Sequence, residues 1–327
     1  MMPVASLVKF EDSRYNVRDM PWSLAGEKKR RFYIIIICAV MVFGVPYLVL
    51  FLRSPVLVLT DLSSVTLYGE ARIKRQINKD SLTLFRRVIP ILIADDAASD
   101  TQIIAITSAM TNSRPFCVLF PIRFFEAAGL FNEQFPDIPA VILEARGVDN
   151  RNYATLATED YYRYKTDIEA DYYQAGLYAG IFTEDLEKRT LVYMDPRLEV
   201  RTRTMAREAL FRGLQEQEIV LDAIYFNHFS ATTDLSQYSC IVLAGSGVDI
   251  LENQLEIPVI LFSWLDPALI PNDILIILDD SPWVQLVPAV RMVAAGEKEG
   301  LIPSNILVLS SRFSDKDILR KVKKASE

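Results

Sequence analysis

The feature that most constrains this chain is a basic cluster followed by a long uncharged apolar run. Four cations, Lys28-Lys29-Arg30-Arg31, precede residues 32–52, which carry no charge. An α-helix rises 1.5 Å per residue, so a helix over this run spans roughly 30 Å, the thickness of a bilayer's hydrocarbon core. The run is longer than the apolar region of a cleaved signal peptide. The sequence therefore predicts one transmembrane helix at residues 32–52, with a buried core helix as the alternative.

The cations on either side of this run predict the orientation of the helix. Four precede it, whereas only Arg53 follows closely. By the positive-inside rule, residues 1–31 are a cytoplasmic tail and residues 53–327 form a body outside the cytoplasm. In a bacterium with two membranes, the expected localisation is the inner membrane, single-pass, with a cytoplasmic N-terminus and a periplasmic C-terminal domain.

The charge of the body argues against two classes of partner. Seven of the 35 Lys/Arg and four of the 42 Asp/Glu lie in the tail, which leaves 28 basic and 38 acidic residues and a net charge of −10. Nucleic-acid binding needs clustered cations to neutralise phosphates, so we expect no nucleic acid. The same reasoning counts against binding of the body to an anionic membrane surface. The predicted membrane contact is the N-terminal helix.

Few residues offer catalytic or metal chemistry. The sequence has a single histidine, His228, and no nucleophile-elbow motif with which it could form a catalytic triad. No Walker motif, dinucleotide fingerprint or metal-ligand spacing is present. Cys117 and Cys240 fall in apolar, strand-like runs, which predicts two buried thiols rather than a disulfide. Paired acidic residues such as Asp95 and Asp96 are the remaining candidates for acid–base work, but adjacent side chains diverge in direction. We expect no enzymatic activity, no cofactor and no metal.

Short apolar runs alternate with amphipathic stretches along the body. The strands of the first series are predicted at 56–60, 88–94, 116–120 and 140–144. The helices between them are predicted at 65–78, 100–111 and 122–135. The strands of a second series are predicted at 161–165, 190–194, 219–226, 240–243, 259–262, 274–278 and 306–309. Uninterrupted apolar runs of this length suit parallel sheets buried on both faces, so the order predicts two doubly wound α/β lobes.

A polar, turn-rich stretch at residues 146–160 separates the two series, and we interpret it as the crossover between lobes. Lobe 1 then covers about 55–150 and lobe 2 about 160–312. A helix predicted at 168–183 contains small residues, which allow close approach of a neighbouring helix. These are Ala175, Gly176, Ala179 and Gly180. Two such lobes joined by a crossover are the layout of a hinged binding protein.

Ligands of open α/β sheets bind beyond the carboxyl ends of the strands. The candidate ligand-binding residues at predicted strand ends, which we expect to line one groove between the lobes, are Asp61, Ser63, Arg123, Ser246, Trp264 and Asp266. An Asp at a strand end is also an ordinary helix N-cap, which is the alternative role. Trp264 as an aromatic platform, with Asp61 and Asp266 as polar anchors, would suit a small polar solute such as a nucleoside or sugar.

Several stretches resemble the basic membrane protein family of type I periplasmic substrate-binding proteins, which often bind nucleosides for ABC importers. The stretches are 135–143 (FPDIPAVIL), 172–180 (YYQAGLYAG), 242–247 (VLAGSG) and 290–297 (VRMVAAGE). The resemblance implies a two-lobed type I periplasmic-binding-protein-like fold, preceded here by the transmembrane helix. Asp61 matches the family's first strand end, but the Phe-Asn pair after it is absent. The family's lysine near the closing helix is replaced around Asp280, so nucleoside specificity is not implied.

Two functions from different classes follow. The first is a membrane-anchored extracytoplasmic substrate-binding-like protein, the receptor of an ABC-type importer for a small polar solute. The second is a degenerate binding-protein fold that acts as a structural or protein-interaction module in an envelope protein complex. The missing ligand motifs and the permanent anchor fit the second.

Overall fold

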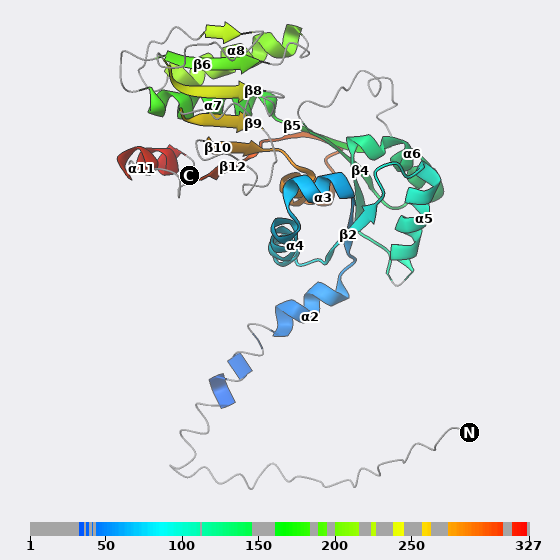
Figure 1. Ribbon diagram of the computed structural model, residues 1–327. Helices are drawn as coiled ribbons and strands as arrows, with labels where there is room; N and C mark the ends of the chain where they lie inside the picture. Colours follow the sequence, from blue (N-terminus) through cyan, green and yellow to red (C-terminus); the bar gives the residue numbers. More distant parts are fainter. Residues whose placement is uncertain are drawn as a thin grey trace, which may run out of the picture. The chain divides into compact units, whose positions relative to one another are not determined.

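A computed structural model of the chain divides it into two units, Met1–Val49 and Leu50–Glu327 (Figure 1). The residues it describes are 33–35, 37–38, 41, 44–111, 113–145, 161–183, 189–194, 200–215, 224–226, 238–244, 257–262, 274–309 and 316–325. Helix α2 (Val45–Leu52) lies within the predicted transmembrane run, part of which is outside the described residues. In the described portion, no helix is both long and apolar enough to cross a bilayer. The transmembrane helix stays a prediction.

The first sheet has the order β11-β5-β4-β3-β1-β2, and its neighbouring strands pair in parallel. Its strands are β1 (Val56–Asp61), β2 (Val88–Ile93), β3 (Cys117–Pro121), β4 (Ala140–Glu144), β5 (Tyr162–Thr166) and β11 (Glu299–Ile302). The strands from β1 to β4 lie within one residue of their predicted ends. Each of β1, β3 and β4 is buried along its whole length, as expected of a parallel strand covered on both faces.

The second sheet has the order β12-β10-β9-β8-β6-β7. Its strands are β6 (Arg189–Met194), β7 (Ile224–Phe226), β8 (Tyr238–Ala244), β9 (Val259–Phe262), β10 (Ile274–Asp279) and β12 (Asn305–Val308). Only the pairing of β12 with β10 is antiparallel among the described strands. In both sheets the first strand lies between the second and the third along the chain, which confirms the predicted doubly wound arrangement.

Helices cover both faces of the first sheet. Helices α3 (Leu62–Tyr68), α4 (Glu70–Leu84) and α10 (Pro282–Ala295) contribute to the core on one face. Helices α5 (Ser99–Met110) and α6 (Phe125–Gln134) build the core on the other. One predicted helix at 65–78 is therefore two helices. The break is at Gly69, whose φ of 84° is open to glycine but not to most other residues.

On the second sheet, helices α7 (Ile168–Phe182), α8 (Val200–Gln215) and α11 (Lys316–Ala325) share one core with the strands. A separate cluster, which includes Leu191, Leu243 and Leu261, lies on the opposite face. Alternating strand residues feed the two clusters, as the pleat requires. Cys117 in the first sheet and Cys240 in the second are buried free thiols, as predicted.

The predicted boundary between the lobes is wrong. Strand β5, expected to open lobe 2, pairs with β4 in the first sheet, and residues 146–160 connect these two strands. Helix α10 and strand β11, expected in lobe 2, also belong to the first sheet. The chain therefore passes between the sheets three times: after β5, after β10 and between β11 and β12. An apolar run specifies a strand but not which sheet it joins, so sequence periodicity could not reveal this.

Buried acidic residues mark all three passages. After β10, Asp279 is fully buried and forms an ion pair with Arg72 of α4 at 2.8 Å. Its other oxygen accepts from the Ser281 backbone N–H at 2.9 Å. Burial raises the pKa of Asp279, and Arg72 and Ser281 oppose that shift.

Hydrogen bonds to buried carboxylates also occur where the chain makes its other two crossings between the sheets. After β5, the Thr166 hydroxyl donates to Asp280 at 3.2 Å and accepts from the Gln285 amide at 2.9 Å. Between β11 and β12, the Ser304 backbone N–H donates to the buried Asp171 of α7 at 2.8 Å. The first two bonds link the end of β5 to the segment after β10 and to α10, and the third links the β11–β12 connection to α7.

Helices α7 and α8 pack so closely that only glycine fits at their crossing. A Cβ on Gly176 would lie 2.2 Å from the Leu210 carbonyl oxygen, and one on Gly213 would lie 2.2 Å from the Tyr173 carbonyl oxygen. The close approach predicted from the small residues of α7 is thus confirmed at Gly176. Its counterpart Gly213 was not predicted, because it stands alone among larger residues.

Gly176→Ala should lower the free energy of unfolding by at least about 2 kcal/mol, because the new methyl group meets rigid backbone rather than a movable side chain. The matched control is Gly129→Ala in α6, where the nearest atom is the Tyr161 hydroxyl at an ordinary 3.5 Å. The control should keep or raise stability, by about 0.5–1 kcal/mol, through helix propensity. Denaturant unfolding measures both. Equal stabilities of the two variants would contradict the close packing.

Arg72→Ala should destabilise the protein by about 3 kcal/mol at neutral pH, because it leaves the Asp279 carboxylate buried without its cation. The loss should grow as the pH rises through the raised folded-state pKa of Asp279, where the carboxyl ionises beside Arg72, and should fade below it. Asp279→Asn in the same chain should restore much of the loss. Lys74→Ala, which breaks an exposed pair with Glu70 on the same helix, should change nothing measurable. A pH-independent loss in Arg72→Ala would contradict this role of the ion pair.

Candidate ligand-binding edge of the first sheet

Asp61 ends β1 and begins α3. Its backbone is extended (φ −112°, ψ 171°), and its Oδ1 accepts from the Ser64 backbone N–H at 2.7 Å, which caps the helix. Its Oδ2 forms an ion pair with Arg123. The Asp61 side chain is 3% exposed, so both oxygens are paired where water hardly reaches. The capping role of Asp61 is confirmed, whereas its role as a polar anchor for a ligand stays a prediction.

Arg123 lies in a short 3₁₀ turn (Ile122–Phe124) directly after β3. Besides the ion pair with Asp61, it donates a hydrogen bond to the Ser64 hydroxyl. Because β3 is the neighbour of β1, these contacts bridge the ends of two adjacent strands. The Arg123 side chain is 42% exposed, and partial burial lowers the pKa of its guanidinium. It remains a cation with further N–H donors.

Ser63 bridges the other neighbour of β1. Its backbone N–H donates to one carboxylate oxygen of Asp95 at 3.1 Å, and its hydroxyl donates to the other at 2.7 Å. Asp95 follows β2 and is exposed. The bonds from Ser63, the hydroxyl first, lower the pKa of the Asp95 carboxyl, so it is ionised at neutral pH.

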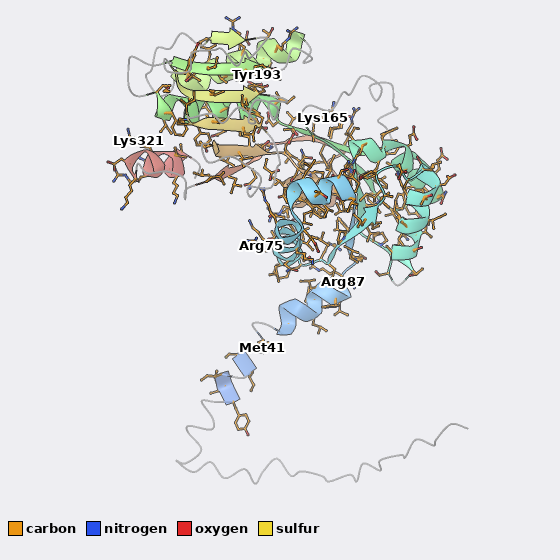
Figure 2. All side chains as sticks on the ribbon, in the orientation of Figure 1. Met41, Arg75, Arg87, Lys165, Tyr193 and Lys321 are labelled. Carbon is orange, nitrogen blue, oxygen red and sulfur yellow. The ribbon has the colours of Figure 1, made fainter. Side chains whose placement is uncertain are left out.

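A further charged residue, which was not among the predicted site residues, lies at the carboxyl end of β4 on the same edge of the sheet. Glu144, the last residue of β4, is buried and forms an ion pair with Arg163 of β5. Lys165 of β5 lies 3.8 Å from its second oxygen and is half-exposed; Figure 2 labels this side chain. The signal for Glu144 was its position as the charged end of an apolar run, the criterion that selected Asp61.

These residues surround the point where the winding of the sheet reverses. The chain moves from β1 outward to β2 and then back to β3 on the other side of β1. In open α/β sheets ligands bind beyond the strand ends at such a point, because the flanking connections leave in opposite directions. Asp61 and Arg123 lie at this point. They bring a carboxylate, a guanidinium and serine hydroxyls together, a set that can donate to and accept from a polar solute.

Three of the six predicted site residues, Asp61, Ser63 and Arg123, thus lie at neighbouring strand ends. Asp61 and Arg123 contact each other and Ser64, whereas Ser63 bonds Asp95. The other three, Ser246, Trp264 and Asp266, lie outside the described residues. A groove that joins all six stays a prediction. In the part of the chain that the structure describes, no group of three or more His, Cys, Asp or Glu side chains could hold a metal ion.

No protein-family model and no curated protein sequence matches this chain. Its structure is similar to a transcriptional activator of the comK gene from Bacillus halodurans, with a TM-score of 0.50, 15% identity, and coverage of 83% of this chain and 95% of that one. A periplasmic ribose ABC transporter protein from Conexibacter woesei gives a TM-score of 0.46, 11% identity, and coverage of 79% and 93%. A carbohydrate transporter solute-binding protein from Agrobacterium radiobacter, in complex with D-arabinose, gives a TM-score of 0.38 and 16% identity. The match covers 82% of this chain and 98% of that one.

Similarity at these identities concerns the fold. The chain has an α/β fold with two largely parallel sheets, and the comK activator structure shares this fold. The narrower assignment to the basic membrane protein family is not confirmed.

Proposed function

We propose that this chain is a membrane-anchored, extracytoplasmic substrate-binding-like protein that binds a small polar solute at the carboxyl edge of its first sheet. The observation that carries the proposal is the network of Asp61, Ser63, Asp95 and Arg123 at the reversal point of a doubly wound sheet. The function is binding rather than catalysis.

The chemistry of the edge favours a neutral, hydroxyl-rich solute such as a sugar or nucleoside. Exposed Asp95 can accept hydrogen bonds from hydroxyl groups, and half-exposed Arg123 can donate to hydroxyl or ring oxygens. A hydroxyl both donates and accepts, so one solute can satisfy a carboxylate and a guanidinium together. Ser246, Trp264 and Asp266 are the residues that the second lobe would contribute when the lobes close on the solute.

The compartment and partner are part of the proposal. Residues 32–52 would anchor the chain in the inner membrane with the body in the periplasm, where the body would deliver its solute to an ABC permease. The polypeptide passes from this run into β1 through Arg53, Ser54 and Pro55, so the first sheet would begin at the membrane surface.

One observation favours the alternative, a structural or interaction module of an envelope complex. Both Asp61 oxygens and both Ser63 donors are satisfied within the chain. The network therefore also serves to fix α3 to the ends of β2 and β3, a role that needs no solute. In that case the edge would be rigid, and adding a small molecule would not change the stability of the protein.

Thermal unfolding of the full-length protein in detergent, with a panel of sugars and nucleosides, tests binding. A solute present at 100 times its dissociation constant stabilises the folded state by about 2.7 kcal/mol, which should raise the melting temperature by about 5 °C or more. Arg123→Ala should weaken binding roughly 10- to 100-fold, the loss of a hydrogen bond to a charged group. Arg114→Ala, which removes an exposed cation paired with Asp137, is the matched control and should bind normally.

The result that contradicts solute binding is a flat melting temperature across the panel in the unsubstituted protein. Stabilisation that survives Arg123→Ala unchanged would retain a binding function but move its site away from this edge.

The orientation is tested by placing a cysteine at the exposed Asp137 and treating intact cells with a membrane-impermeant thiol reagent. Asp137→Cys should be labelled when the outer membrane is permeabilised, since the body would be periplasmic. The unsubstituted protein is the control, because Cys117 and Cys240 are buried and the exposed Cys38 would lie within the membrane-spanning run. Labelling that requires lysis of the inner membrane would place the body in the cytoplasm and reject the proposed orientation.

A further inference from the structure

The chain enters the first sheet through a tight set of backbone contacts. The Arg86 guanidinium donates to the Ser54 carbonyl oxygen at 3.0 Å. The Val56 N–H donates to the Arg87 carbonyl oxygen at 2.8 Å. The Arg87 guanidinium lies over the Phe51 ring, 5.4 Å from its centroid. Figure 2 shows Arg87 where α2 gives way to the sheet. Arg86 and Arg87 are therefore held next to the end of the apolar run.

Arg86, Arg87 and the nearby Arg53 concentrate positive charge at the amino ends of β1 and β2. Arg53, Arg86 and Arg87 form no ion pair with any described residue. Burial, and then the neighbouring Arg53 charge, lower the pKa of Arg86, which shows that two cations lie within mutual influence. Residues 71–94 contain six Lys/Arg and one acid, Asp80. Asp80 is buried, and its burial raises its pKa to about 6.

Apolar side chains are exposed beside the arginines. Leu82 is 58% exposed and Phe85 is 45% exposed. Phe85 closes α4 in the left-handed conformation (φ 49°, ψ 39°), which Gly or Asn adopts far more easily. An aromatic ring in solvent, on a backbone conformation that disfavours it, has no role in the core of the lobe. Aromatic rings and arginines together are typical of side chains at a membrane–water interface.

We propose that Arg53, Leu82, Phe85, Arg86 and Arg87, the basal patch, rest on the anionic phospholipid headgroups of the membrane that holds residues 32–52. The inference depends on the anchor proposed above, because the anchor keeps the patch at the surface. Each cation close to an anionic surface shifts the docking equilibrium about fivefold. The attraction acts within a Debye length of roughly 8–10 Å, so the acid-rich remainder of the body does not cancel it. Orientations that bring the acid-rich remainder within this distance of the lipid surface are repelled, which orients the body.

Docking by the basal patch has a consequence for the candidate binding edge. The patch lies at the amino ends of β1 and β2, whereas Asp61 and Asp95 follow their carboxyl ends. A six-residue strand spans roughly 17 Å at 3.3 Å per residue. A body docked through its basal patch therefore presents the candidate binding edge away from the lipid.

The test uses the full chain in nanodiscs whose lipids carry bromine near the headgroup, because bromine quenches tryptophan fluorescence on contact. Phe85→Trp reports on the patch. Leu301→Trp is the control, because Leu301 is 60% exposed and lies on β11, at the other edge of the sheet from β2. The unsubstituted protein gives the background of Trp22, Trp264 and Trp283. The discs contain phosphatidylcholine alone or with roughly 30% phosphatidylglycerol, the anionic lipid.

We expect Phe85→Trp to be quenched at least about twofold more in anionic than in neutral discs, and Leu301→Trp to be quenched in neither. Adding Arg53→Gln and Arg87→Gln should shift the docking equilibrium about 25-fold, five for each cation, and about 0.5 M salt should act likewise. Phe85→Gly removes the ring and relaxes the backbone, so it should keep or raise thermal stability while protecting α4 less from hydrogen exchange on anionic discs.

The two proposals fail in distinguishable ways. If the chain does not co-purify with nanodiscs, the anchor is wrong. If the chain is incorporated and Phe85→Trp is quenched no more than Leu301→Trp, the basal patch does not dock and the anchor stands. Quenching that is equal in neutral and anionic discs would contradict the role of the arginines.

Discussion

A buried carboxylate needs a partner, and three of the strands that the structure describes end in one. Asp61 ends β1, Glu144 ends β4 and Asp279 ends β10. Each forms an ion pair with an arginine from another element: Arg123, Arg163 and Arg72. A buried pair adds little stability over an apolar pair, but removal of one member is costly. The pairs therefore act by fixing which elements lie together: β1 with β3, β4 with β5, and the exit of β10 with α4.

The strands of the fold could be predicted from the sequence because a strand buried on both faces appears as an uninterrupted apolar run. The runs at 56–60 and 140–144 are apolar up to their last residue, and both are strands. The carboxyl-end rule brought Asp61, Ser63 and Arg123 into one set before their contacts were known. What failed was the assignment of strands to sheets. Strand β5 reads Tyr-Arg-Tyr-Lys-Thr, and nothing in those residues distinguishes a further strand of lobe 1 from the first strand of lobe 2.

Contacts that depend on register or on long separations were also beyond sequence reasoning. Arg163 reaches Glu144 because β4 and β5 pair with Ile142 opposite Arg163. Arg72 and Asp279 are 207 positions apart. The basal patch differs, since a local charge count would have found it. A net charge of −10 averages over the whole body, and residues 71–94 alone are strongly basic. Electrostatic contact with a surface depends on charge within a Debye length, so the average was the wrong quantity.

The exposure of the network decides how a solute could use it. Asp61 is 3% exposed and has its partners, whereas Arg123 is 42% exposed and keeps further donors. A solute would therefore meet Arg123 and Asp95 first, with Asp61 behind them holding the guanidinium in place. This order assigns the buried acid to positioning and the half-exposed cation to recognition. It also explains how one network can serve folding and binding: the buried half is satisfied without a solute, and the exposed half still has hydrogen-bonding capacity to offer.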